Sequence, residues 1–302
     1  MIKENKICAV VITYNPNIEL LTNEYNSVIS QVDSIYYVDN NSSNKDVLKE
    51  WSGQKDSTYF IWLNTNEGIG KAQNCGIRKA IIDGASHVLI LDQDTVLSAD
   101  FVNCLLNTEK KAICEGHNVG ITAPVFLSVE DNYAYPIPTI CNNKVVRIPI
   151  SNINKYIEVS HVIASGQLIR AEVFGKVGLM REDLFIGYVD FEYCFRARKK
   201  GFSIIVSNEA IMHHTIGDRQ ILLCKRKIGL YSPFRRYFDC RNTLLIQKDK
   251  SFPPTLAKYY LKLLPMKILV SIIGGPNRLK QIRYIVKGIY DGLRGISGYC
   301  TI

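Results

Sequence analysis

The first hundred residues alternate between apolar, β-branched runs and amphipathic helical patterns, and this alternation constrains the fold more than any other feature. Four strands are predicted at residues 7–14, 34–39, 59–63 and 87–92, and three helices at residues 18–31, 45–51 and 71–83. Strands that alternate with helices favour parallel βαβ units in an open sheet covered by helices. Ligands of such sheets bind outside the carboxyl ends of the strands, so the residues that follow each strand should carry the function.

Small, polar or acidic side chains follow all four predicted strands. Because the carboxyl ends of parallel strands meet at one edge of a sheet, we expect these side chains to surround one cleft. In strand order they are Thr13, Tyr14 and Asn15; Asp39; Asn66, Lys71 and Asn74; and Asp92, Gln93 and Asp94.

Asp92 and Asp94 flank a single residue directly after the apolar run 88–91. Hard divalent cations prefer one or two carboxylates together with phosphate oxygens of the substrate. This spacing also occurs by chance in solvated loops, but its position after the fourth strand of a βαβ series favours a metal site. We therefore predict a Mg²⁺ or Mn²⁺ ion that bridges these carboxylates and a diphosphate.

Gly68 and Gly70 open a pattern similar to the GxGxxG sequence of dinucleotide-binding proteins. Gln73 stands in place of the third glycine, and the pattern follows the third strand rather than the first, so a NAD-dependent oxidoreductase is disfavoured. A plain strand-to-helix turn is the simpler interpretation, although it does not explain why three polar side chains crowd the same turn.

Asp190 stands where an apolar segment meets a predicted helix that ends near residue 201. An N-terminal helix cap is the ordinary role of such an aspartate, and a general base close to the substrate is the functional alternative. The two roles are compatible. Downstream, His213 and His214 precede Gly217, and one of them is a candidate metal ligand, with a structural role as the alternative.

Basic residues are concentrated near the C-terminus. Residues 219–302 hold 17 Lys or Arg and 3 Asp or Glu, a net charge of +14, whereas residues 1–218 carry a net charge of −5. We place a domain boundary near residue 218. This asymmetry favours an anionic partner, either nucleic acid or an acidic membrane surface. A solvated basic face is the third possibility.

Neither a nucleic-acid-binding motif nor a membrane-spanning segment accompanies this charge. No uncharged apolar run approaches the roughly 20 residues that a span needs, and the N-terminus lacks a signal-peptide pattern. The nine cysteines form no CxxC pair, which favours reduced thiols. We therefore predict a cytoplasmic protein with an anionic partner.

Several of these motifs together resemble the family 2 inverting glycosyltransferases with the GT-A fold, and among them the bacterial rhamnosyltransferases of O-antigen and related surface polysaccharides. They occur in family order over residues 7–218, and the segment 237–242, with Arg241 and Asn242, is similar to the tails of rhamnosyltransferases. The motifs are VITYN at 11–15, VDNNS at 38–42, NEGIGKAQN at 66–74, LDQD at 91–94, SG at 165–166, YVDFEYC at 188–194 and HTIG at 214–217.

The resemblance implies a fold and a set of residue roles. The fold would be an α/β, Rossmann-like GT-A domain over residues 1–218, with a mostly parallel sheet flanked by helices, followed by a basic helical region over residues 219–302. Donor-binding residues would be Thr13, Tyr14, Asn15 and Asp39 at the base and ribose, with Asn66, Lys71, Asn74, Asp92 and Gln93 along the cleft. Asp92, Asp94 and His214 would serve the metal, and Asp190 would be the catalytic base.

The chain departs from the family pattern around the base. Many relatives carry an acidic residue in place of Gly187 and Glu-Asp in place of Val189-Asp190, so Asp190 is the remaining central carboxylate, with Glu192 as a substitute one helical step on. The implied donor is a nucleotide sugar, dTDP-L-rhamnose first, and the implied acceptor is a lipid-linked oligosaccharide. With this acceptor, the basic tail is expected to bind an anionic membrane surface rather than nucleic acid, peripherally on the inner face of the plasma membrane. A galactofuranosyl or other hexosyl transferase and a nucleic-acid-binding protein remain alternatives.

Overall fold

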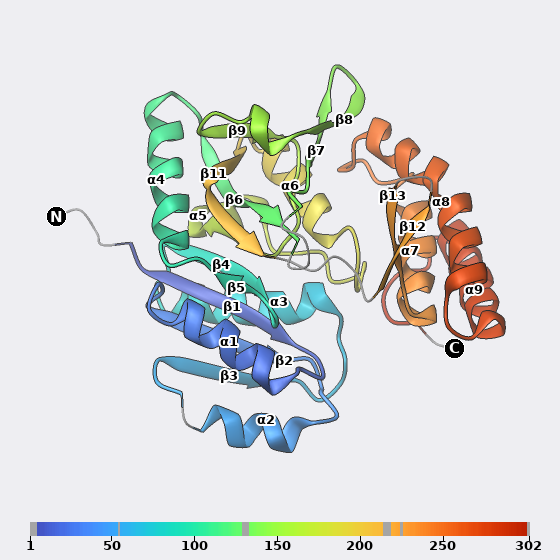
Figure 1. Cartoon of the computed structure of the whole chain (residues 1–302), viewed down its shortest axis with the longest axis horizontal. Coiled ribbons are helices and arrows are strands. Elements are labelled where there is room, and N and C mark those ends of the chain that lie inside the picture. The colour runs from blue at the N-terminus through green and yellow to red at the C-terminus, as the bar shows by residue number, and fades with distance from the viewer. Residues whose placement is uncertain (1–4, 54, 129–132, 214–218, 224–225, 301–302) are drawn as a thin grey trace.

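The structure is a computed structural model that describes residues 5–53, 55–128, 133–213, 219–223 and 226–300. A central sheet flanked by helices takes up residues 7–213, and a hairpin and three helices follow it at one end (Figure 1). The main sheet has the strand order β3 (Thr58–Trp62), β2 (Ser34–Asp39), β1 (Ile7–Thr13), β4 (His87–Asp92), β10 (Gln167–Arg170), β6 (Val119–Leu127), β11 (Ser203–His213) and β5 (Val96–Leu97), and β9 (Tyr156–Val159) pairs with β11.

The N-terminal half of the sheet is the predicted parallel unit. It comprises β1 (Ile7–Thr13), α1 (Ile18–Val28), β2 (Ser34–Asp39), α2 (Lys45–Ser52), β3 (Thr58–Trp62), α3 (Ile69–Ile82) and β4 (His87–Asp92). Pairing sets Thr13 opposite Asp39, and Ile12 opposite Asp92. The carboxyl ends of β1, β2 and β4 therefore meet at one edge, as the sequence predicts.

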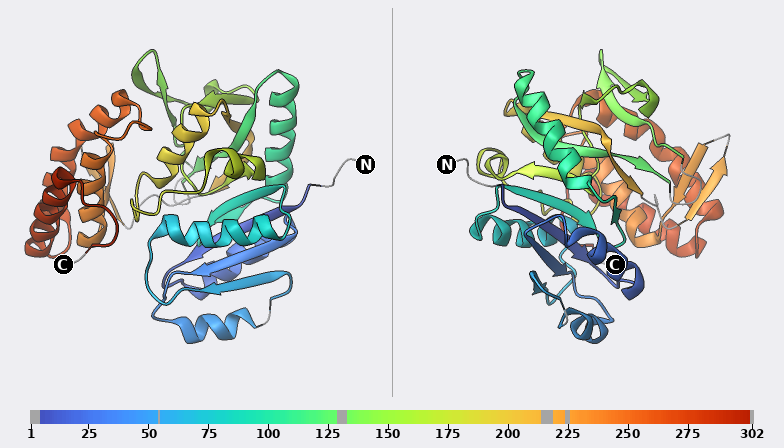
Figure 2. Two further views of the ribbon diagram at one scale, coloured as in Figure 1. Left: turned by 180° about the vertical axis from the view of Figure 1, so that it is seen from behind. Right: turned by 60° about the vertical axis from the view of Figure 1, so that its left-hand side comes forward.

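The strands of this half are apolar along their whole length because both faces of the sheet are covered. Val10 and Val38 pack toward α3, which Figure 2 shows in front of the sheet when the molecule is seen from behind. Val11 and Tyr37 belong to the other core, which includes Leu21 of α1. Helices on both faces leave only the strand ends open to a ligand.

The second half of the sheet is mixed. Its elements are β5 (Val96–Leu97), α4 (Phe101–Cys114), β6 (Val119–Leu127), the hairpin β7 (Ile137–Cys141) and β8 (Lys144–Ile148), a 3₁₀ turn (Ile150–Asn152), β9 (Tyr156–Val159), β10 (Gln167–Arg170), α5 (Ala171–Val177), α6 (Val189–Lys199) and β11 (Ser203–His213). Strand β10 runs antiparallel between β4 and β6, whereas β6 and β11 are parallel.

The apolar composition of residues 159–169 is typical of a single strand, but the chain does not form one. The chain forms β9 and β10 instead, and residues 160–166 between them loop out. Gly166 adopts a φ of 80°, which favours glycine. The Gln167 side chain donates to the carbonyl oxygens of Val162 and Ile163. These bonds satisfy two carbonyl groups within the loop, so this apolar segment does not need a neighbouring strand there.

The C-terminal region consists of β12 (Arg219–Leu223), β13 (Arg226–Leu230), α7 (Pro233–Leu245), α8 (Pro254–Gly274) and α9 (Arg278–Arg294). Helices α7 and α9 pack closely, since Gly288 lies against the backbone of Tyr237 and Gly292 lies against that of Arg241. Figures 1 and 2 place these helices beside the sheet domain, at the end where β8 and the α6 region lie.

Candidate active site

The loops after β1 and β2 are joined through Asp39, whose side chain is buried. Thr13 Oγ1 donates to Asp39 Oδ1 at 3.1 Å, and the Ser42 amide donates to Asp39 Oδ2 at 3.0 Å. Asn15 has a φ of 50°, and its Oδ1 accepts the Ser43 amide at 2.7 Å. Three predicted donor-binding residues therefore lie in one hydrogen-bonded loop pair.

Tyr14 and Gln93 connect the end of β1 with the end of β4. The Tyr14 amide donates to Gln93 Oε1 at 2.8 Å, and Gln93 Nε2 donates back to the Tyr14 carbonyl at 3.4 Å. The Tyr14 side chain is 49% exposed, so its ring is open to a ligand at this edge. The structure thus brings the VITYN and LDQD motifs together.

The loop after β3 is held by Asn40 and Asn66. Asn40 Nδ2 donates to Asn66 Oδ1 at 3.0 Å, and the same Asn66 oxygen accepts the Gly68 amide at 3.1 Å. Lys71 forms a half-exposed ion pair with Glu67 at 2.8 Å. These bonds extend the polar edge from β2 to β3.

Helix α3 contacts the segment 180–188, which leads to Asp190. The Asn74 side chain is buried and exchanges two 2.9 Å hydrogen bonds with the backbone of Met180. A Cβ atom on Gly68 would lie 2.6 Å from the Phe185 carbonyl oxygen, and one on Gly70 would lie 2.5 Å from that of Arg181. The two glycines of the GxGxxG-like pattern therefore allow this close approach.

Helix α7 holds the same segment from the other side. Arg241 and Asn242 are fully buried. The Arg241 guanidinium donates to the carbonyl oxygens of Asp183, Leu184 and Gly298. Asn242 Nδ2 donates to Leu184 and Ile186 at 2.9 Å, and to Gly187 at 3.3 Å. Side chains of the C-terminal region thus fix the backbone just before Asp190.

That backbone is unusual, because three of its residues have positive φ. Phe185 adopts 63°, Gly187 adopts 81° and Tyr188 adopts 65°. Such conformations are costly for residues other than glycine. They persist here because hydrogen bonds from two helices determine the path of the segment. The segment brings Asp190 into the first turn of α6.

Asp190 is partly buried, and both carboxylate oxygens accept backbone hydrogen bonds. Oδ1 accepts the Phe191 amide at 2.9 Å, and Oδ2 accepts the Ala164 amide at 3.2 Å. Burial, with a smaller contribution from the charge of Asp92, raises the pKa of Asp190 to about 6, although the backbone amides oppose the shift. The predicted base and the predicted metal ligand therefore share one electrostatic environment.

Asp92 and Asp94 present carboxylates at the end of β4. The Asp92 amide donates to Ser165 Oγ at 3.1 Å, and the Asp94 side chain is exposed. Two carboxylates suit a divalent cation whose other ligands are diphosphate oxygens. The donor set therefore fits Mg²⁺ or Mn²⁺. His214 lies outside the described residues, and among those that are described no third ligand joins this pair.

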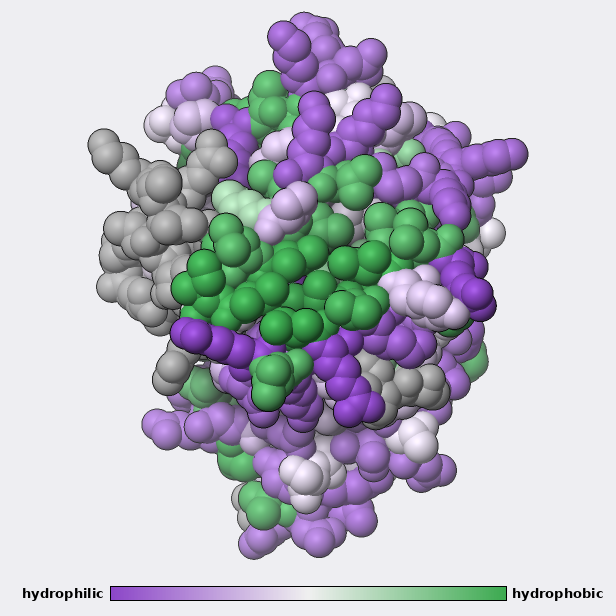
Figure 3. All heavy atoms as spheres, turned by 90° about the vertical axis from the view of Figure 1, so that its right-hand side faces the viewer, coloured by the Kyte–Doolittle hydropathy of each residue, from purple (hydrophilic) through white to green (hydrophobic). Residues whose placement is uncertain are grey.

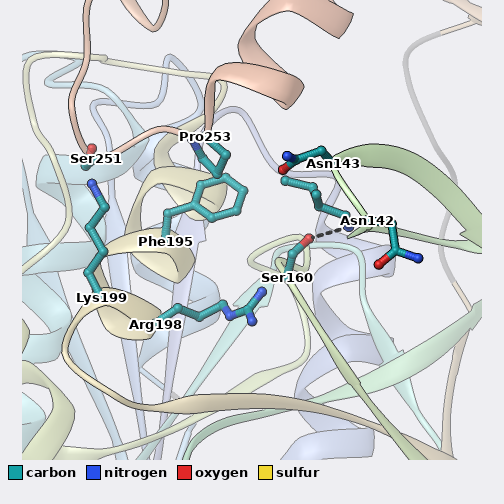
Figure 4. A pocket seen from close by; sticks show the side chains of 9 residues that line it. Asn142, Asn143, Ser160, Phe195, Arg198, Lys199, Ser251 and Pro253 are labelled. Atoms are coloured by element: carbon teal, nitrogen blue, oxygen red, sulfur yellow. Dashed lines mark hydrogen bonds between the residues drawn. The ribbon is translucent and has the colours of Figure 1, made fainter.

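A pocket of about 580 Å³ lies apart from the strand ends (Figure 4). Asn142, Asn143 and Ser160 line one side, and Arg198 and Lys199 of α6 line the other, with Ser251 and Pro253 above them. None of the predicted donor-binding or metal-binding residues lines it. We therefore place the candidate active site at the strand ends and the start of α6.

Sequence reasoning assigned no role to two features of this site. The Ala164 amide reaches Asp190 from the loop between β9 and β10, and the composition of that loop gave no signal of it. Tyr260 of α8 lies with its ring centroid 5.1 Å from that of Tyr188, two residues before Asp190. In the sequence, Tyr260 is marked only by the aromatic and basic residues around it.

We expect the raised pKa of Asp190 to appear in the pH dependence of the protein's activity. A carboxylate that accepts a proton must be ionised, so kcat/KM should be low below about pH 6 and should rise to a plateau above it. A bound divalent cation would move the transition to lower pH, since positive charge favours the carboxylate. Initial rates from pH 4.5 to 8.5 measure this. A profile that is flat through this range would contradict the assignment.

Comparisons of the sequence point to one family. The model of the family described as "Glycosyl transferase family 2" matches residues 8–178. The "dTDP-rhamnosyl transferase RfbF" of Shigella flexneri is 31% identical over 297 residues, which cover 97% of each chain. The "Low-salt glycan biosynthesis hexosyltransferase Agl10" of Haloferax volcanii is 24% identical over 296 residues, 95% of this chain and 90% of that one.

Solved structures share the fold at low sequence identity. GalNAc-T7 with UDP, GalNAc and Mn²⁺ gives a TM-score of 0.59 at 14% identity, over 98% of this chain and 59% of that longer chain. S. aureus TarS 1-349 in complex with UDP-GlcNAc gives a TM-score of 0.56 at 15% identity, over 96% of this chain and 81% of that one. Both comparisons extend beyond the sheet domain to nearly the whole chain.

Proposed function

The chain belongs to glycosyl transferase family 2, and on this premise we propose that it transfers L-rhamnose from dTDP-L-rhamnose to a lipid-linked glycan in surface-polysaccharide synthesis. The observation that carries the choice of sugar is the 31% identity to a dTDP-rhamnosyl transferase over 97% of both chains. Since the similarity spans the C-terminal helices as well as the sheet domain, it includes both sides of the candidate site.

The donor would lie across the ends of β1 to β4. Thr13, Tyr14, Asn15 and Asp39 would bind its base and ribose, and Asn66, Lys71 and Gln93 would line the path of its diphosphate. The support for this placement is that all these residues lie on the one polar edge described above. Asn74 would act indirectly, because both polar atoms of its amide bind the segment before Asp190.

Asp92 and Asp94 would hold Mg²⁺ or Mn²⁺, with His214 as a further candidate ligand. When bound, the ion would supply positive charge to the diphosphate of the donor. The remaining steps belong to the chain's own residues. Asp92 also acts on Asp190, because its negative charge helps to keep the pKa of that carboxyl high.

Asp190 would act as the general base of a single displacement. It would accept the proton of the acceptor hydroxyl while that oxygen bonds to the anomeric carbon. The bond between this carbon and the donor phosphate oxygen would break, and the nucleoside diphosphate would leave with the electron pair. One base suffices for such an inverting transfer, unlike the carboxylate pair of a glycosidase. A pKa near 6 suits a base that works at neutral pH.

Replacement of Asp94 by alanine tests the metal proposal. Loss of one charged ligand typically costs about 1.5–3 kcal/mol, so donor affinity should fall roughly 10- to 100-fold and stimulation by Mg²⁺ or Mn²⁺ should disappear. Calorimetric titration of the donor with and without each ion provides the measurement. Asp46→Ala, at an exposed aspartate of α2, is the control. Full activity of the wild-type protein in excess EDTA would contradict the proposal.

A donor screen tests the proposed function. The wild-type protein is incubated with dTDP-L-rhamnose, UDP-galactofuranose and other UDP- and dTDP-hexoses, and release of the nucleoside diphosphate is measured. We expect dTDP-L-rhamnose to be consumed fastest. A clear preference for another sugar would contradict rhamnose as the donor sugar but not the assignment as a glycosyltransferase. The similarity to a hexosyltransferase makes a hexose the alternative.

An exposed apolar face on α8 and α9 supports a lipid-linked acceptor. Leu279 is 82% exposed, Ile273 63%, Leu293 61% and Val286 60%. Figure 3 shows a continuous apolar area on this side of the molecule, bordered by hydrophilic side chains. Basic residues with apolar neighbours on a helix favour binding in the membrane interface. No helix in the described part of the chain is long and apolar enough to cross a membrane.

Liposome co-sedimentation tests this surface. The wild-type protein should sediment with anionic liposomes at low salt, and high salt should release only part of it, because salt screens the charges but not the apolar contact. Leu279→Asp combined with Val286→Asp should abolish most binding. Ile82→Asp, at a 76% exposed residue of α3, serves as the matched control. A wild-type protein that stays in the supernatant at low salt would contradict peripheral attachment.

A further inference from the structure

Tyr260 of α8 lies beside the catalytic base although it belongs to the C-terminal region. Its ring centroid is 5.1 Å from that of Tyr188 and 6.3 Å from that of Phe191. Tyr188 and Phe191 flank the base in the sequence, one on either side of the start of α6. An aromatic wall defined by Tyr188, Phe191 and Tyr260 therefore lies at the start of α6, and the charge of Asp190 acts on the Tyr260 phenol.

The Tyr260 hydroxyl is available for a ligand. The residue is only partly buried, and none of the hydrogen bonds within the described residues uses its hydroxyl. Burial raises the pKa of the Tyr260 phenol, and the negative charge of Asp190 raises it further, while the positive charge of Arg147 on β8 opposes the shift. Tyr259, Asp239 and Lys267 also face this phenol. The phenol therefore keeps its proton at neutral pH and can donate a hydrogen bond.

The direction from which the acceptor oxygen attacks the donor sugar decides whether donor or acceptor lies against this wall. In a single displacement the acceptor oxygen and the leaving phosphate lie on opposite sides of the anomeric carbon. The donor-binding residues lie at the ends of β1 to β4, whereas Figure 1 shows α8 among the C-terminal helices, away from these strands. The acceptor hydroxyl must come within about 2.6–3.2 Å of the base, and the wall beside that base is then a surface that the acceptor sugar can contact.

We propose, on the basis of the proposed function, that Tyr260 binds the acceptor glycan and that its hydroxyl orients the sugar hydroxyl that Asp190 deprotonates. The ligand class is a neutral, hydroxyl-rich sugar, which a phenol recognises through its polar tip and its apolar ring. Tyr260 lies in the first half of α8, and exposed Leu269 and Ile273 follow in its second half. One helix would thus place the sugar at the base and the lipid at the membrane.

Two variants of Tyr260 separate the hydroxyl from the ring. Tyr260→Phe removes one neutral hydrogen bond and should raise the acceptor KM about 2- to 10-fold. Tyr260→Ala removes the ring as well and should lower kcat/KM for the acceptor about 100-fold, since buried contacts of an aromatic ring are lost in addition. The affinity for dTDP should stay unchanged in both, because the hydrogen bonds described for Thr13, Tyr14 and Asn66 run to the loops at the strand ends and not to α8.

The acceptor probe is the membrane fraction of cells in which this chain's gene is deleted, because the unextended acceptor remains there. Labelled sugar incorporated into lipid gives kcat and KM, and calorimetry gives the affinity for dTDP. Tyr59→Ala is the matched control, since Tyr59 is 48% exposed on β3 and packs against one other ring, that of Tyr36. All variants are first compared by thermal unfolding.

The outcomes distinguish this inference from the proposed function. If the wild-type protein uses a donor other than dTDP-L-rhamnose, the rhamnose proposal fails, and the Tyr260 comparison is made with the donor that the screen identifies. An acceptor KM and kcat of Tyr260→Ala that match those of Tyr59→Ala would overturn the inference. A loss of dTDP affinity that parallels the loss of transfer would also overturn it, because Tyr260 would then serve the donor.

Discussion

Replacement of Asp190 by asparagine is expected to lower kcat for sugar transfer about 10²- to 10⁴-fold, the usual contribution of a general base. Asparagine keeps the shape of the side chain and can still accept the Ala164 amide hydrogen bond through its carbonyl oxygen. It cannot take the proton of the acceptor hydroxyl. The affinity for dTDP should therefore remain that of the wild-type protein, and the loss should fall on the chemical step.

The same substitution should not destabilise the fold. Because burial raises the pKa of Asp190 from 3.8 to about 6, its stabilising contribution belongs to the protonated form and is lost as the pH rises through about 6. At pH 7.5 the ionised carboxylate therefore costs stability, which asparagine removes. Its NH₂ group cannot accept the Phe191 amide, so these effects oppose each other and the Tm should stay close to that of the wild-type protein. Asp46→Asn is the control. If the transfer rate of Asp190→Asn stays within a few-fold of that of the wild-type protein, Asp190 is not the base, and Glu192 becomes the candidate.

Replacement of Arg241 by alanine is expected to damage both stability and catalysis. The carbonyl oxygens of Asp183, Leu184 and Gly298 would each lose a hydrogen bond from the guanidinium, although Asn242 would still donate to Leu184 and the Gly298 amide to Asp183. A hydrogen bond to a charged group contributes about 1.5–3 kcal/mol, so loss of three of them should lower the free energy of unfolding by several kcal/mol. Since Asp183 and Leu184 begin the strained segment before Asp190, kcat should fall as well, and the pH profile should shift as the base becomes more exposed.

Urea unfolding and a pH profile of transfer measure these effects. Arg241→Lys should restore little, because an ammonium group cannot reproduce the fork of a guanidinium. Arg235→Ala, at an exposed arginine of the same helix, is the matched control and should change neither quantity. If Arg241→Ala behaves like Arg235→Ala, the C-terminal region does not position the base. A loss of stability with an unchanged pH profile would limit Arg241 to a structural role.

The sequence predicts the first half of the fold well because local patterns there coincide with the final structure. Each predicted strand over residues 7–92 forms, and the polar residues after these strands meet through contacts such as Thr13 with Asp39 and Tyr14 with Gln93. In parallel strands the register alone brings the carboxyl ends together, so no knowledge of distant contacts is needed.

The surroundings of Asp190 could not be predicted in this way, because they depend on contacts between residues far apart in the sequence. The Ala164 amide arrives from a loop whose composition favours a strand, and Arg241 and Tyr260 arrive from helices beyond the proposed domain boundary. Residue 218 therefore separates two regions that differ in charge, but residues from both regions surround Asp190. Removal of residues 219–302 would take away the partners of Leu184 and Ile186.

The configuration of the product tests the central claim, a single displacement with Asp190 as the only base, most directly. The wild-type protein is given dTDP-L-rhamnose and the membranes of the gene-deleted cells, and the new glycosidic linkage is released and identified by NMR. We predict that the anomeric carbon has the configuration opposite to that in the donor, and that Asp190→Asn forms at most traces of this product. A linkage that retains the donor's configuration would contradict the account, because retention requires a second displacement and another nucleophile.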